Sequence, residues 1–149
     1  MTKNEFYDAL ELMRKEMRFV ITEDAMFPST DALTYAKLCN VAFMHNYATT
    51  SGKELDSSLY LCLSLEEANG GVNGVLSVVT CWAREYCDNI KKLSELVLCV
   101  NWKAWEHADR QNERWGRFYS KLYCTLDELI IEYYEGREDE ISYYIQYLD

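Results

Sequence analysis

The sequence predicts an all-α protein, with residues 1–149 forming a single-domain bundle of about six to seven helices. The chain has 149 residues, a usual size for one domain, and 49% of them are apolar. Such a chain buries enough surface to offset its conformational entropy. It contains one proline and six glycines, which is too few for the frequent turns of an all-β sandwich or barrel.

The first helix is expected over residues 3–19. Thr2 precedes it and Glu5 follows three positions later, which is the pattern of a capping box. Apolar residues then recur at helical spacing and define one buried stripe: Phe6, Leu10, Met13 and Met17. A connection that contains Pro28 leads to a second helix, which is expected from residue 31 to about residue 49.

A third helix is expected over residues 54–68, with Leu55, Leu59, Cys62 and Leu63 turned inward, and Gly70-Gly71 ends it. Residues 72–86 are open to two interpretations. Their β-branched core would suit a strand, whereas the spacing of their apolar residues favours a buried helix. Gly74 lies within this segment and lowers its helix propensity by about 1 kcal/mol relative to alanine.

The last three helices are expected over residues 89–108, 113–135 and 138–147. The longest amphipathic stripe of the chain belongs to the middle one and comprises Trp115, Phe118, Leu122, Leu126, Leu129 and Tyr133. Gly136 then ends that helix.

The net charge is −10, and the acidic residues gather near the C-terminus. Residues 125–149 hold eight acids and one base, so they carry −7 of this charge. No basic stripe is visible, so direct binding to nucleic acid or to an anionic membrane is not expected. The acids are either a solvated helix face or a patch for a basic partner, such as a nucleic-acid-binding protein: Asp127, Glu128, Glu132, Glu135, Glu138, Asp139 and Glu140.

Aromatic residues support a second kind of interaction surface. The chain has 12 tyrosines and four tryptophans, and many of them follow residue 100. The helix over 113–135 has too many aromatics for one face, so some lie at a boundary. They either complete the core or form a tyrosine-rich surface, which includes Tyr134 and Tyr143, for a protein partner or a homodimer.

Six cysteines lie in apolar stretches, where a free thiol behaves as a small buried hydrophobe. The N-terminus is charged from its third residue, unlike a secretory signal, and no apolar run approaches 18 residues. We therefore expect free thiols and a cytoplasmic protein.

Catalytic, metal and cofactor sites are not expected. The chain lacks a Cys-x-x-Cys pair, and neither His45 nor His107 has a second histidine at i+4 or a glutamate at i−3. Glu106 is adjacent to His107, but adjacent helical residues do not face each other. His107 is therefore expected in solvent or at the edge of the core. The best indication of an enzyme would be a deep pocket that contains His45 or His107 with a perturbed pKa.

The last third of the chain resembles small accessory proteins encoded by phages and conjugative elements of Gram-positive bacteria. Asn101, Trp105 and His107 match a Leu-Asn-x-x-x-Trp-x-His-like helix of these proteins. Residues 141–143 with Asp149 approximate their Leu-Ser-Tyr-x-Tyr-x-x-x-Asp-like tail. The resemblance implies an accessory protein of a mobile element and implies no chemistry.

Together these observations predict a non-enzymatic interaction protein of a mobile genetic element. By analogy in size and charge, it is comparable to anti-CRISPR-type inhibitors, which imitate nucleic acid and block host defence nucleases. The alternative is a homodimeric structural or regulatory helical module, and an enzyme with an unrecognised site is the third hypothesis.

Overall fold

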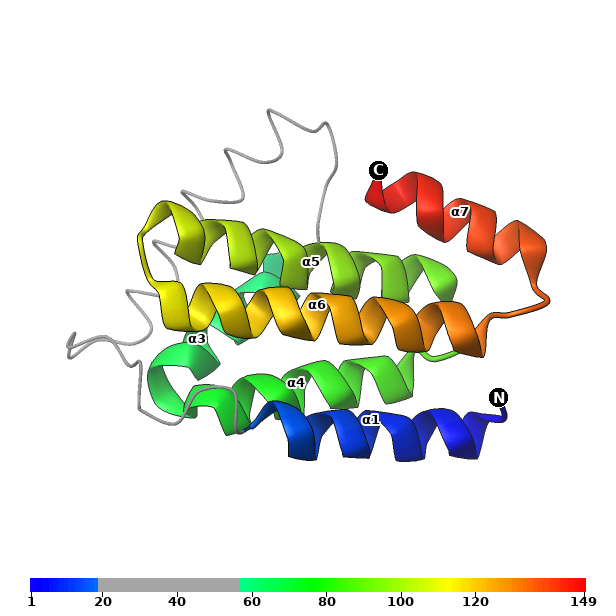
Figure 1. Ribbon diagram of the computed structural model, residues 1–149, viewed down its shortest axis with the longest axis horizontal. Helices are drawn as coiled ribbons and strands as arrows, with labels where there is room; N and C mark the ends of the chain where they lie inside the picture. Colours follow the sequence, from blue (N-terminus) through cyan, green and yellow to red (C-terminus); the bar gives the residue numbers. More distant parts are fainter. Residues whose placement is uncertain (19–56) are drawn as a thin grey trace.

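The computed structural model describes residues 1–18 and 57–149, and this part of the chain forms six α-helices and no strand. The predicted all-α fold is therefore confirmed. The helices are α1 (Lys3–Met17), α3 (Ser57–Asn69), α4 (Gly71–Glu85), α5 (Ile90–Asp109), α6 (Glu113–Tyr133) and α7 (Glu138–Leu148) (Figure 1). The second helix expected over residues 31–49, and the expected start of the third at residue 54, lie outside the described residues.

Helix α1 begins with the predicted capping box. The Thr2 hydroxyl accepts a hydrogen bond from the Glu5 backbone N–H at 3.1 Å, and the Glu5 carboxylate accepts one from the Thr2 N–H at 3.1 Å. Two of the backbone donors at the helix start are thereby satisfied. The stripe predicted for this helix is buried against α4 and α6: Phe6, Leu10, Met13 and Met17.

Residues 72–85 are helical and Tyr86 is the C-cap of α4, which settles the choice between helix and strand. Helix α3 ends at Asn69, and Gly70 then caps α4. Gly71 has a φ of +62°, a conformation that glycine adopts without steric cost. Val75, Leu76 and Val79 have no exposed surface and form one buried helix face, whereas Val78 is only partly buried.

Helices α5 and α6 run antiparallel through the middle of the bundle (Figure 1). Asn89 caps α5 by accepting a hydrogen bond from the Lys92 N–H at 3.2 Å, and Asn112 caps α6 by accepting one from the Trp115 N–H at 3.4 Å. The long stripe predicted for α6 is buried except at Leu129, which is half-buried.

The other helices cover this central pair. Helix α1 packs on α6 and α4, α3 packs on α4 and α5, and α7 crosses beside α5 (Figure 1). Apolar side chains from all six helices meet in one hydrophobic core. Within the described residues, no helix is long and apolar enough to cross a bilayer.

The cysteines only partly follow the sequence prediction. The five described cysteines are free thiols, as expected, but burial holds for Cys87 and Cys99 alone. The exposed thiols are Cys62, Cys81 and Cys124. Each lies in an apolar stretch of sequence but falls on the outer side of its helix. For Cys62 this overturns the expected inward position. Cys39 lies outside the described residues.

Candidate functional sites: a buried ionic cluster and an acidic groove

Polar and charged side chains meet inside the bundle, where helices α3, α5 and α6 come together. We call this group the ionic cluster. Each of its members has no exposed surface, and they are Ser64 and Glu67 from α3, Lys103, Glu106 and His107 from α5, and Tyr119 from α6. Such complete burial is rare for Lys and Glu unless they are paired.

Lys103 lies between the two carboxylates of the cluster. Its Nζ is 2.7 Å from Glu67 Oε2 and donates a hydrogen bond to the Ser64 hydroxyl at 2.9 Å. It also pairs with Glu106 Oε2, one helical turn further along α5. The ring of Tyr60 lies 4.9 Å from the ammonium and adds a cation–π contact. The ammonium therefore links α3 to α5 through charge.

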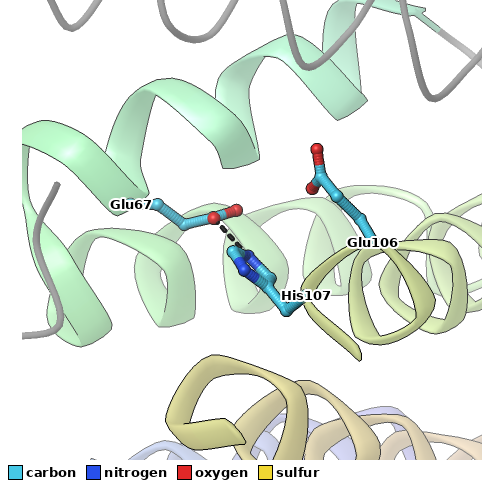
Figure 2. Close-up of side chains that lie close together, drawn as sticks. All are labelled: Glu67, Glu106 and His107. Atoms are coloured by element: carbon cyan, nitrogen blue, oxygen red, sulfur yellow. Dashed lines mark hydrogen bonds and ion pairs between the residues drawn. The ribbon is translucent and has the colours of Figure 1, made fainter. Parts of the chain in front are cut away.

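Glu67 receives donors from both other helices. Its Oε1 lies 2.5 Å from His107 Nε2 (Figure 2), and its Oε2 accepts a hydrogen bond from the Tyr119 hydroxyl at 2.8 Å. The His107 ring is stacked against the rings of Trp115 and Tyr119, with centroid separations of 5.8 and 5.6 Å. This packing fixes the plane of the imidazole.

Charge pairing outweighs burial in setting the ionisation of the cluster. Burial alone would raise the pKa of Glu67, but the charges of Lys103 and His107 bring it below its ordinary value. Burial alone would lower the pKa of Lys103, but Glu67 and Glu106 bring it above its ordinary value. Burial and the neighbouring Glu67 both raise the pKa of Tyr119. At neutral pH, the cluster therefore holds an ammonium, ionised Glu67 and a neutral phenol.

The sequence-based expectation for His107 is wrong. His107 is fully buried rather than solvated or at the edge of the core, and Glu106 beside it is buried as well. Both residues reach the cluster, since ligand atoms of Glu67, Glu106 and His107 lie within 4.8 Å of one another. His45 lies outside the described residues.

A sequence signal for this cluster does exist. Glu67 continues the buried stripe of α3, four residues after Leu63, and Lys103 and His107 continue the buried stripe of α5 after Val100. When charged residues occupy the core-facing positions of two helices, they must pair with one another inside the core, or the helices cannot bury those faces. The partner of His107 is 40 residues away, so no local motif could show it.

A second site lies on the surface, where the end of α6 meets the start of α7. We call it the acidic groove. Its volume is about 690 Å³, and its walls carry four glutamates and two isoleucines; it is lined by Glu128, Ile131, Glu132, Glu135, Gly136, Glu138, Ile141 and Ser142. Ile131 is 41% exposed, so the groove offers apolar surface between acids.

The residues that the sequence suggested for partner binding fall into two groups in the structure, those on the surface and those engaged in internal contacts. Glu128, Glu132, Glu135 and Glu138 line the groove. Asp139 and Glu140 follow on the first turn of α7, and Tyr143 is 36% exposed on the same helix. Asp127 instead accepts a hydrogen bond from Tyr144 at 2.6 Å. Tyr134 is fully buried and donates its hydroxyl to the Cys87 carbonyl at 2.6 Å, so it is not available on the surface.

The groove glutamates keep their charge unpaired within residues 1–18 and 57–149, since no ion pair there includes Glu128, Glu132, Glu135 or Glu138. Arg137 is the base next to them in sequence. It lies over the ring of Tyr134, 4.6 Å from the centroid, and within 3.6 Å of Asp88 and 3.9 Å of Glu140. The groove therefore presents net negative charge to solvent.

Comparisons of the chain with models of known protein families, with curated proteins and with solved structures find no match.

Proposed function

We propose that the protein is a binding module whose acidic groove takes a basic segment of another protein. The observation that carries the proposal is the groove itself, in which four glutamates without a described ion pair surround the exposed Ile131 and the partly buried Ile141. Acids alone would serve solubility. Acids that surround apolar surface in a groove fit a segment with both kinds of side chain.

The charges come from both helices. Glu128 and Glu132 lie one turn apart on α6, and Glu135 follows in the turn after that helix. Glu138 lies at the start of α7 on the other side of Gly136. Like charges so arranged repel one another, and a cationic partner relieves that repulsion. The attraction also accelerates association and weakens as salt is added.

The isoleucines supply the contact that salt does not screen. Ile131 lies among the glutamates of α6, and Ile141 faces the same groove from α7. Ile145 is 47% exposed and lies one turn beyond Ile141. An apolar side chain of the partner that enters the groove would bury this surface. The fitting segment therefore has an apolar anchor between arginines or lysines.

Proteins that bind nucleic acid present basic surfaces of this kind. The resemblance of the last third of the chain to accessory proteins of mobile elements favours a nucleic-acid-binding enzyme of the host, such as a defence nuclease, as the partner. The acids of the groove then occupy the partner's basic surface in place of phosphates.

The proposal is tested with two labelled synthetic peptides of equal positive charge, one with leucine and one with serine between its arginines. Fluorescence anisotropy measures their binding to the wild-type chain. We expect the leucine peptide to bind at least about tenfold more tightly, a difference of about 1.4 kcal/mol.

Two variants with the same net charge then locate the site. One changes Glu128, Glu132, Glu135 and Glu138 to glutamine, and the control neutralises four exposed acids elsewhere, Asp8, Glu16, Glu85 and Asp109. We expect the first to lose binding and the control to keep it. Equal binding by both variants would show that net charge alone attracts the peptide. A dimer in sedimentation velocity that the groove variant abolishes would favour the homodimeric module instead.

A further inference from the structure

One oxygen of the ionic cluster is not satisfied. Glu106 is fully buried, and its Oε1 has no hydrogen-bond partner within the described part of the chain. The other oxygen of the same carboxylate pairs with Lys103. An ionised carboxylate has about four acceptor sites, and leaving a buried one without a donor or cation is unfavourable. The buried carboxylate of Glu106 therefore lacks a donor or cation at one of its two oxygens.

Three groups of the cluster are suited to hold a cation. Glu67, Glu106 and His107 each provide one ligand atom, and these atoms lie within 4.8 Å of one another (Figure 2). Bonds from Zn²⁺ to nitrogen and oxygen are about 2.0–2.2 Å, so the ligand atoms of one tetrahedral ion lie about 3.3–3.6 Å apart. The 2.5 Å contact between Glu67 Oε1 and His107 Nε2 would have to open, by rotation of these side chains, to admit an ion between them.

We propose that Glu67, Glu106 and His107 form a binding site for one divalent first-row transition-metal ion. One imidazole nitrogen and two carboxylates are ligands that such ions accept in proteins, and zinc binds strongly within the series. The ion would join α3, which supplies Glu67, to α5, which supplies the other two ligands.

Charge favours a cation at this place. The two carboxylates carry two negative charges, and Lys103 offsets one of them. The Oε1 atom of Glu106 still has no hydrogen-bond partner in the described part of the chain. A metal ion bound to all three side chains satisfies Glu106 as well. Coordination requires an imidazole nitrogen without a hydrogen, so metal binding releases any proton held there to solvent.

Lys103 sets the affinity of the site, because its ammonium and the metal ion compete for the same two carboxylates. Replacing Lys103 with methionine removes the competing cation and leaves excess negative charge. The Lys103→Met variant is therefore expected to bind Zn²⁺ more tightly than the wild type. Its melting temperature is expected to rise more on addition of Zn²⁺.

The first test measures metal content. The full chain is refolded with Zn²⁺, dialysed against metal-free buffer and analysed by mass spectrometry for bound metal. We expect about one ion per chain in the wild type and in Asp109→Asn, an exposed acid on the same helix. Glu106→Gln and His107→Gln are expected to lose more than about tenfold in affinity. Absence of stoichiometric Zn²⁺ from the wild type, or equal binding by all four proteins, would overturn the proposal.

A second measurement avoids variants that fail to fold. Co²⁺ is added to the wild-type chain, and the ring resonances of its two histidines are followed by NMR. Coordination is expected to shift the His107 resonances strongly and to produce visible absorption of bound Co²⁺. Unshifted His107 resonances at saturating Co²⁺ would show that the cluster does not bind metal.

Discussion

The hydroxyl of Tyr144 donates a 2.6 Å hydrogen bond to the carboxylate of Asp127, and this contact joins α7 to α6. Tyr144 is the residue of α7 with almost no exposed surface. Burial and the hydrogen bond to Asp127 both raise the pKa of the phenol, so the phenol stays protonated and keeps donating at neutral pH. The acidic groove depends on this contact, since α7 forms one of its walls.

Replacing Tyr144 with phenylalanine is expected to destabilise the fold by about 1–2 kcal/mol, because the hydrogen bond to a charged acceptor is lost while the packing remains. Urea unfolding measures the change. Tyr143→Phe is the matched control, since Tyr143 is partly exposed on the same helix, and its change is expected within about 0.5 kcal/mol. Equal losses in both variants would contradict a specific role for the Asp127 contact.

Lys103→Met is expected to lower the free energy of unfolding by about 3–5 kcal/mol in metal-free buffer, because it leaves the carboxylates of Glu67 and Glu106 buried without their ammonium. Lys121→Met, at an exposed position of α6, is the control and should change little. Guanidinium denaturation followed by circular dichroism gives both values. A loss below about 1 kcal/mol for Lys103→Met would mean that the cluster does not need this cation.

Two glycine-to-alanine changes should have opposite effects. Gly136 has a φ of +89° and nothing within 4 Å of an added Cβ, so alanine there costs about 1–2 kcal/mol in backbone strain alone. Gly116 lies inside α6, and its added Cβ would be 3.8 Å from the nearest atom, an ordinary contact. Alanine there should stabilise by up to about 1 kcal/mol through helix propensity. Thermal unfolding measures the change in stability of both variants. A change of the same sign in both would contradict the conformational argument.

The stability of the fold should decline in acid partly through Asp88. Hydrogen bonds from Lys3 and Tyr133, helped by the charges of Lys3 and Arg137, hold the pKa of Asp88 below its ordinary value. Its contribution is therefore fully present above about pH 4, near the pKa of an unfolded aspartate, and is lost as the pH falls through the lower folded pKa.

Asp88→Asn is accordingly expected to be less stable at pH 7 and to lose stability less steeply below about pH 4. The free energy of unfolding is measured against pH for this variant, for the wild type and for Asp8→Asn, which changes an exposed aspartate of α1. If the free energy of unfolding falls equally steeply with pH in Asp88→Asn and in the wild type, Asp88 does not contribute to the loss of stability in acid.

The helices could be predicted from the sequence because their signals are local. The capping residues Thr2 and Glu5 and the periodic stripe of α6 depend on neighbours within a few positions, and the structure confirms them. Tyr134 shows the limit of this reasoning, since its burial depends on the Cys87 carbonyl, 47 residues away in the chain.

The candidate sites required contacts that sequence patterns do not show. The acids of the groove were visible as a charged segment, but their arrangement around Ile131 and Ile141 depends on the angle between α6 and α7. The ionic cluster does not follow from ligand spacing within one helix, because Glu67 lies on α3 and His107 lies on α5.

The ionic cluster also determines how α3 and α5 align along their length. Apolar side chains tolerate sliding, because one leucine can replace another as a neighbour. Lys103 does not, since a shift of one helical turn, about 5.4 Å, would carry its ammonium away from Glu67 and leave both charges buried alone. The cluster therefore fixes the register of α3 against α5, because it destabilises a misaligned pair of helices more than it stabilises the aligned one.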